Sequence, residues 1–150
     1  MSRLQLALNV DDLDTAIDFY AKLFGVAPAK TRPGYANFAV AEPPLKLVLV
    51  ENPGQGGTLN HLGVEVESSD RVDAEQTRLA SVGLASIDER GTTCCYAKQD
   101  KFWVESTPHG ERWEIYTVLA DSETFAAEDL SCCATSVSAD GPAPTASACC

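Results

Sequence analysis

Residues 4–10 read LQLALNV, and this stretch decides the fold because a similar one returns later in the chain. Its apolar and polar residues alternate, which is typical of a β-strand with one buried face. The acidic pair Asp11 and Asp12 follows at once and predicts the N-terminal cap of a helix. Residues at helical spacing then predict a helix that ends before Gly25. They are Leu13, Ala16, Ile17, Tyr20, Leu23 and Phe24.

Short strands separated by turn residues are expected after this helix, and the second half of the chain then repeats the whole order. In the first half these strands lie at about residues 29–31, 35–40 and 45–51. In the second half we expect a strand at 59–67, a helix capped by Ser69 or Asp70 and ending at Gly83, and strands at about 86–94, 101–107 and 112–119.

The two halves align when Asn9 is matched with Glu65, an offset of about 56 residues that matches Gln5 with His61. The pattern predicts an α+β fold in which a βαβββ module is used twice, at about residues 1–52 and 58–119. The second half needs several more residues before its last strand. We expect this surplus as an extra loop around residues 92–101, where function often resides.

The composition is that of one acidic domain. The chain has 150 residues, with 11 Lys and Arg against 22 Asp and Glu, for a net charge of −11. Binding to a phosphate backbone or to anionic lipid needs a basic stripe, so nucleic acid and membrane are excluded as partners. No apolar run reaches the roughly 18 residues of a membrane span or resembles a signal peptide. We therefore expect a cytoplasmic protein.

Residues 120–150 differ from the rest because they are acidic and rich in Ala, Ser, Thr and Pro. Such a segment buries too little apolar surface to offset its ordering entropy, so we expect a largely disordered tail, with at most a short helix over residues 123–130. The six cysteines occur only as adjacent pairs, a spacing that indicates neither a disulfide framework nor a zinc site. The pairs are Cys94-Cys95, Cys132-Cys133 and Cys149-Cys150.

Three polar side chains lie on strand faces opposite apolar neighbours: Gln5, His61 and Glu114. An imidazole, a carboxylate and an amide oxygen suit a divalent metal with open coordination positions. The position in the first half that matches Glu114 falls near Leu47 or Val48, which cannot ligate a metal. The sequence therefore offers three protein ligands.

A structural role is the alternative for each of these residues. A single strand histidine more often makes a structural hydrogen bond, and a single strand glutamate is usually solvated. The repeat, which pairs Gln5 with His61, favours the metal site, although glutamine is a weak ligand. Glu65 is a reserve candidate, and His109, which lies in a turn, is a weaker one. The pair Cys94-Cys95, taken alone, is more typical of two small buried residues than of a binding site.

Three motifs carry a family resemblance: the helix end YAKLFG at residues 20–25, LNHLG at 59–63, and TTCCYA at 92–97. With the doubled βαβββ pattern, they resemble the vicinal oxygen chelate superfamily, which includes glyoxalase I, extradiol dioxygenases and bleomycin-resistance proteins. Within it they are similar to the non-haem iron C–As lyases (organoarsenical demethylases) and the cadmium-induced proteins. The resemblance covers about residues 1–119 and implies a half-barrel.

The resemblance implies that Gln5, His61 and Glu114 hold Fe(II), with other divalent metals as substitutes, and that Cys94 and Cys95 bind the arsenic of a trivalent organoarsenical. Dioxygen would be the second substrate, and arsenite the product of cleaving methylarsenite. The departure is Gln5, where extradiol dioxygenases have a second histidine, although some glyoxalases use glutamine.

The chemistry fits the residue types. Trivalent arsenic is soft, so thiolates are its natural ligands, and methylarsenite has two exchangeable positions, which two adjacent thiols match. Lysines close in sequence are expected to favour the thiolates, and a mobile lid over the site is expected from Tyr96, Lys98, Lys101 and Trp103. The accessory thiols Cys132, Cys133, Cys149 and Cys150 are expected to scavenge soft metals.

Two other functions stay open. A cadmium- or arsenic-binding sequestration protein without turnover would suit six thiols and an acidic surface equally well. A glyoxalase-type lyase or a thiol-dependent resistance transferase would not explain three cysteine pairs. Members of the superfamily pair modules within or between chains, so the resemblance leaves a homodimer open as well.

Overall fold

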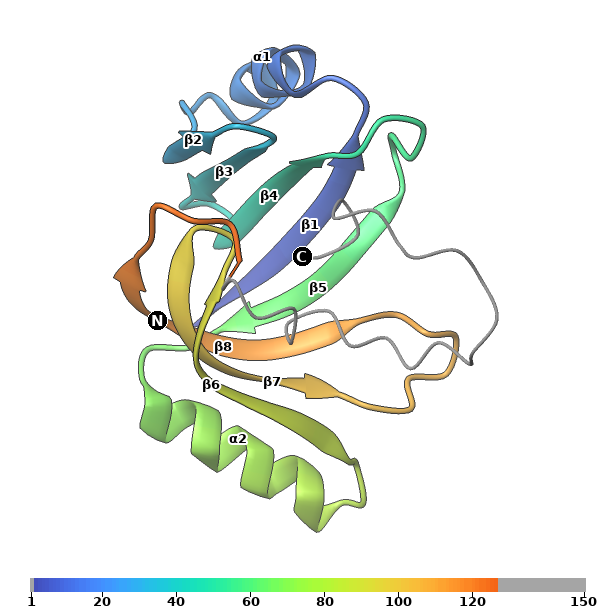
Figure 1. Cartoon of the computed structure of the whole chain (residues 1–150), viewed down its shortest axis with the longest axis vertical. Helices are drawn as coiled ribbons and strands as arrows, with labels where there is room; N and C mark the ends of the chain where they lie inside the picture. Colours follow the sequence, from blue (N-terminus) through green and yellow to red (C-terminus); the bar gives the residue numbers. More distant parts are fainter. Residues whose placement is uncertain (1, 127–150) are drawn as a thin grey trace.

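The computed structural model describes residues 2–126, which form one eight-stranded mixed sheet with two helices (Figure 1). The strand order is β2-β3-β4-β1-β5-β8-β7-β6. The elements are β1 (Arg3–Val10), α1 (Leu13–Phe24), β2 (Lys30–Arg32), β3 (Tyr35–Val40), β4 (Leu45–Glu51), β5 (Leu59–Glu65), α2 (Ser69–Ser81), β6 (Ser86–Cys94), β7 (Ala97–Val104) and β8 (Trp113–Asp121).

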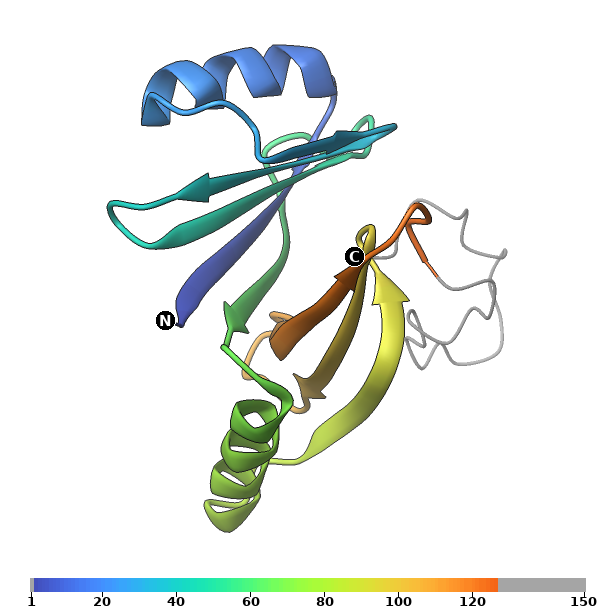
Figure 2. The ribbon, with the colours of Figure 1, turned by 90° about the vertical axis from the view of Figure 1, so that its left-hand side faces the viewer.

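The doubled βαβββ module is confirmed. In each half the first strand pairs in parallel with the last, β1 with β4 and β5 with β8, and β1 pairs with β5 antiparallel at the centre. Ala7 lies opposite Val48 just as Gly63 lies opposite Glu114, so Val48 occupies the place of Glu114 in the first half, one of the two positions that the sequence analysis predicts. Figure 2 shows the two halves turned toward each other, with α1 and α2 on their outer faces at opposite ends.

Both helices begin where a short polar side chain accepts a backbone hydrogen bond. Asp12 accepts from the N–H of Thr15, which confirms the predicted cap of α1, and Gly25 ends that helix at φ 67°. The cap of α2 is Ser68, one residue earlier than predicted, because the extended Ser68 presents its hydroxyl to the N–H of Arg71.

Apolar residues hold each helix against the convex side of the sheet. Beneath α1 the core contains Phe38 and Leu47, and Val72 of α2 packs with Phe102 and Ile115 of the sheet. The convex side is therefore filled by the two helices, and the polar residues of the strands face the concave interior.

The prediction of an extra loop around residues 92–101 is wrong. These residues are the ends of β6 and β7, joined by a tight turn in which Cys94 pairs with Ala97. The surplus lengthens a hairpin: β6 and β7 have 9 and 8 residues, against 3 and 6 in β2 and β3. The sequence CCYA lacks the Asn-Gly signal of such a turn, so it resembled a loop.

The last strand continues to Asp121, two residues further than expected. Beyond it, Phe125 packs against Tyr35 and Tyr96 in the interior. Residues 123–126 form bends and a bridge in place of the first part of the suggested helix. The remainder of that helix, and the accessory thiols Cys132, Cys133, Cys149 and Cys150, lie outside the described residues. Over the described range, no helix is long and apolar enough to cross a membrane.

Candidate metal and dithiol site

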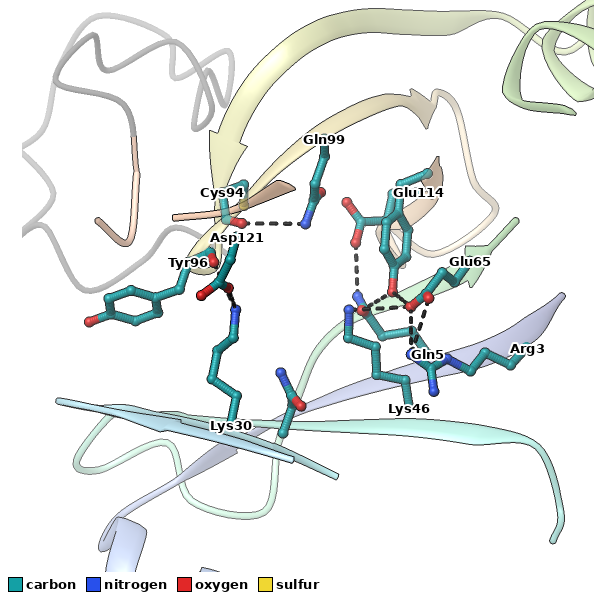
Figure 3. Close-up of polar contacts among 12 residues, drawn as sticks. Arg3, Gln5, Lys30, Lys46, Glu65, Cys94, Tyr96, Gln99, Glu114 and Asp121 are labelled. Carbon is teal, nitrogen blue, oxygen red and sulfur yellow. Dashed lines mark hydrogen bonds and ion pairs between the residues drawn. The ribbon is translucent and has the colours of Figure 1, made fainter. Parts of the chain in front are cut away.

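Three adjacent strands bring the predicted ligands together on the concave face. Gly63 of β5 lies between Gln5 of β1 and Glu114 of β8, and His61 is two residues away on the same face of β5. The Gln5, His61 and Glu114 side chains are all buried, with residue exposures of 4%, 1% and 3%. We call this group the cradle; Figure 3 labels two of its members, Gln5 and Glu114.

The cradle atoms converge on one point. The Gln5 Nε2 atom lies 2.9 Å from His61 Nε2 and 2.8 Å from Glu114 Oε1. The His61 Nε2 atom is itself 3.3 Å from Glu114 Oε1. Strand pairing thus brings Gln5 next to His61, 56 positions later in the chain, and next to Glu114, 109 positions later, as the repeat predicts.

The orientation of the Gln5 amide is inconsistent with its contact to the Tyr116 hydroxyl. The Tyr116 hydroxyl is 2.5 Å from Gln5 Oε1 and 2.9 Å from Glu65 Oε2, and one hydroxyl hydrogen cannot be donated to two acceptors. Burial raises the pKa of Glu65, but the nearby Lys46 ammonium outweighs it, and the resulting pKa is lowered. Glu65 is therefore an ionised acceptor that claims the Tyr116 proton.

Turning the Gln5 amide over resolves the conflict. The amide nitrogen then donates to Tyr116, which donates to Glu65. The amide oxygen in turn faces His61 Nε2 and Glu114 Oε1. Three lone pairs would meet there without a hydrogen between them, which is the donor set of a cation site. The residues present thus fit a divalent metal.

His61 is held in the tautomer that a ligand needs. Its Nδ1 atom lies 2.7 Å from Asn60 Oδ1, so the Nδ1–H donates outward and the Nε2 lone pair faces the cradle. The Asn60 amide is oriented in turn by donating to Asn9 Oδ1 over 2.9 Å. This is the outer hydrogen bond that metal-binding histidines usually make.

Glu114 is kept as a carboxylate by its neighbours. Burial raises its pKa, but the Lys101 ammonium, 3.2 Å from Oε2, is the main cause that outweighs burial and holds the pKa far below its usual range. Burial lowers the pKa of Lys101, but Glu114, the Cys95 thiolate and Glu89 together raise it. Lys101 is thus a buried cation that contacts Glu114 of the cradle and interacts electrostatically with Cys95.

The cysteine pair lies at the tip of the β6–β7 hairpin. Cys94 is buried, Cys95 is half-buried, and their sulfur atoms are 3.3 Å apart. Cys95 and Tyr96 have φ values of 54° and 60°, the left-handed region that costs a residue with a side chain roughly 1–2 kcal/mol. Strain of this kind clusters at functional positions, so the turn is a candidate site in its own right.

The expected lid residues lie in different places. Lys98 is exposed, and Tyr96 is buried, with its hydroxyl donating to Pro33 O over 3.1 Å. Lys101 is fully buried and donates a hydrogen bond to Glu114 of the cradle. The Trp103 ring stands edge-on to His61 at 5.6 Å between centroids.

One strand connects the cysteine pair to the cradle. On the concave face of β7, Gln99 donates from Nε2 to Cys94 O over 3.3 Å, and Lys101, two residues further, donates to Glu114. An apolar cluster lines the concave side beside Cys95. Its members are Ala7, Tyr35, Val48, Val50, Tyr96 and Phe125.

The sequence analysis missed Asn60, Gly63 and Tyr116, which support the cradle, and Gln99, which donates to the Cys94 carbonyl. Asn60 could have been found because it precedes His61 in the sequence. The others come close to the site only through the pairing of strands, which the sequence does not show. Within residues 2–126, no group of three or more His, Cys, Asp and Glu could hold a metal, since the third cradle donor is an amide. A surface pocket of about 450 Å³ at the start of α1 shares none of these residues.

Comparison with known proteins agrees with this fold. The model of the Glyoxalase/Bleomycin resistance protein/Dioxygenase superfamily matches residues 3–115. Cadmium-induced protein CadI of Mycobacterium tuberculosis is 70% identical over 125 residues, 83% of this chain and 82% of that protein. A trivalent organoarsenical cleaving enzyme of Thermomonospora curvata is 55% identical over 152 residues, 100% of each chain.

Among solved structures, the Mn(II)-bound glyoxalase of Novosphingobium aromaticivorans has the same fold, with a TM-score of 0.55 at 19% identity. The match covers 85% of this chain and 44% of that one. The doubled module, the concave cradle and the family match lead to one conclusion: the chain belongs to the Glyoxalase/Bleomycin resistance protein/Dioxygenase superfamily.

Proposed function

We propose that this protein is an Fe(II)- and dioxygen-dependent enzyme that cleaves the carbon–arsenic bond of trivalent organoarsenicals such as methylarsenite and releases arsenite. The observation that carries the proposal is the short path along β7 from the cysteine pair to the cradle, through Gln99 and Lys101. The full-length relative named as a trivalent organoarsenical cleaving enzyme supports it.

Cys94 and Cys95, in their thiol form, would bind the substrate. Two thiolates take the two exchangeable positions of methylarsenite, and the sulfur separation of 3.3 Å suits two ligands of one arsenic atom. The charge of Cys95 raises the pKa of Lys101, and the same attraction favours the thiolate. The apolar cluster beside Cys95 would receive the organic group and exclude water from it.

Gln5, with its amide turned, His61 and Glu114 would hold the metal. An Fe(II) ion bound there would supply dioxygen activation at its open coordination positions. The chain's own residues prepare these ligands. Asn60 fixes the His61 tautomer, Lys101 keeps Glu114 ionised, and Tyr116 orients the Gln5 amide.

The second candidate is sequestration of cadmium or arsenic by the cysteine pair without turnover. It is favoured by the 70% identity to a cadmium-induced protein. This function would need the thiols but neither the cradle nor dioxygen, so the two candidates differ in what the cradle does.

The test is to incubate the Fe(II)-loaded full-length protein in air with methylarsenite and a thiol reductant, and to follow the arsenic species. Release of many equivalents of arsenite per protein supports the enzyme. Stoichiometric retention of unchanged methylarsenite leaves only sequestration. His61→Ala should abolish arsenite release, and His109→Ala, which changes the exposed second histidine, should leave it intact.

A further inference from the structure

Gln99 carries a buried acceptor that nothing in the described part of the chain satisfies. The residue is 4% exposed, and its Oε1 atom is buried without a hydrogen-bond partner. The other end of the amide is fixed, because Cys94 O can only accept and must face the Gln99 nitrogen. The orphan group is therefore a carbonyl oxygen, and it needs a donor.

The orphan oxygen lies in the candidate site. Figure 3 shows Gln99 projecting from β7 into the space between Cys94 and Glu114. A buried carbonyl without a partner costs free energy, so such a group persists where a ligand completes it. The ligand has to offer an N–H or O–H group close to the cysteine pair.

The chemistry of arsenic identifies that donor. Trivalent arsenic makes three bonds, and the two thiols would take two of them. As each sulfur–arsenic bond forms, an arsenic hydroxyl leaves as water with the thiol proton, and no electron is transferred. The third position then holds carbon in bound methylarsenite, which donates nothing, but a hydroxyl in bound arsenite.

We propose that Gln99 Oε1 accepts a hydrogen bond from the hydroxyl of arsenite held by Cys94 and Cys95. This inference rests on the proposed arsenic binding by the two thiols and adds that inorganic arsenite, the product, is a preferred ligand of the same site. Gln99 is a specificity-determining residue that favours the inorganic form. Release of arsenite then requires this hydrogen bond to break.

Calorimetric titrations with arsenite and with methylarsenite test the proposal. They use iron-free, oxygen-free full-length protein in which Cys132, Cys133, Cys149 and Cys150 are changed to serine, with a reductant that has no thiol. Methionine is similar in size to glutamine but cannot accept this hydrogen bond. Gln99→Met should therefore lower the affinity for arsenite about three- to tenfold relative to the affinity for methylarsenite, which is the effect of one net hydrogen bond. Loss of the Cys94 contact alone would weaken both ligands equally.

An unchanged ratio of the two affinities in Gln99→Met, with methylarsenite still bound, would overturn the role of Gln99 and leave the proposed function standing. Failure of both arsenicals to bind the unsubstituted Gln99 protein would overturn the proposed function as well. If Gln99→Met does not fold, the side-chain amide signal of Gln99 in NMR spectra decides the question. It should shift more with arsenite than with methylarsenite, and equal shifts would refute the hydrogen bond.

Discussion

Gln5 and Glu114 lie on either side of Gly63, and the Gln5 amide meets the Glu114 carboxylate at 2.8 Å across that glycine. The two side chains come together because the strand between them has no side chain at this point. A Cβ atom on Gly63 would lie 3.2 Å from Gln5 Nε2, from Glu114 Cγ and from Tyr116 Cε1. The absence of a side chain on Gly63 therefore lets these two cradle side chains meet.

Gly63→Ala should weaken Fe(II) binding by roughly tenfold, because the ligands must shift by a few tenths of an ångström. Metal titration monitored by the d–d absorption of Co(II) would measure this, with the cysteines blocked. Val64→Ala is the control, since Val64 packs on the α2 side of the same strand. It should lower stability but leave the metal affinity unchanged, and an equal loss of affinity in both variants would contradict the role of Gly63.

Asn60→Ala should lower metal affinity by about 10- to 100-fold, because His61 loses the acceptor that fixes its tautomer. The same Co(II) titration applies. Asn60→Asp retains an acceptor for the Nδ1–H and should recover most of the affinity. If Asn60→Ala binds metal as tightly as the unchanged protein, the contact only packs the strand.

The convergence of Gln5, His61 and Glu114 could be predicted because it depends on two regularities of the sequence. Alternation shows which strand face a residue occupies, and the repeat gives pairing partners without a structure. The helix caps near Asp12 and Gly25 are equally local signals. Assignment of the cradle as a metal site stays a prediction.

Other features depend on contacts that no local pattern records. Lys101 is a lysine in a strand, which usually means a solvated side chain, and its burial depends on Glu114 and Glu89 from other positions. Tyr116 and Gly63 become meaningful only once the register between β5 and β8 is known. The turn after Cys94 was misassigned because Cys95 and Tyr96 adopt a conformation that their residue types disfavour.

Lys101→Met should lower the free energy of unfolding by roughly 3–5 kcal/mol at pH 7, because Glu114 would remain as a buried charge without its main partner. In the unchanged protein the lowered pKa of Glu114 contributes stability above the unfolded value near 4.5, and this contribution is lost as the pH falls through the folded pKa. In Lys101→Met the lysine charge no longer opposes the effect of burial, so the pKa of Glu114 is higher than in the unchanged protein.

The cost of Lys101→Met should therefore be greatest at pH 7 and smaller near pH 4, where Glu114 can take up a proton on folding. Urea unfolding at both pH values would measure it. Lys98→Met, an exposed lysine on the same strand, should change stability by no more than about 0.5 kcal/mol at either pH. A cost that is independent of pH would mean that Lys101 acts through packing alone.

Cys95→Gly should be more stable than Cys95→Ala by about 1 kcal/mol, because only glycine adopts φ 54° without a steric penalty. Both variants lack the thiol, so their difference in urea unfolding reports the backbone strain and no ligand chemistry. At the neighbouring position the order of stability should be reversed, so that Cys94→Gly is less stable than Cys94→Ala. Cys94 ends strand β6, where glycine costs roughly 0.5–1 kcal/mol relative to alanine. Equal signs at the two positions would show that the turn stores no strain, and the cysteine pair would then be held by packing with Tyr96 and not by the turn.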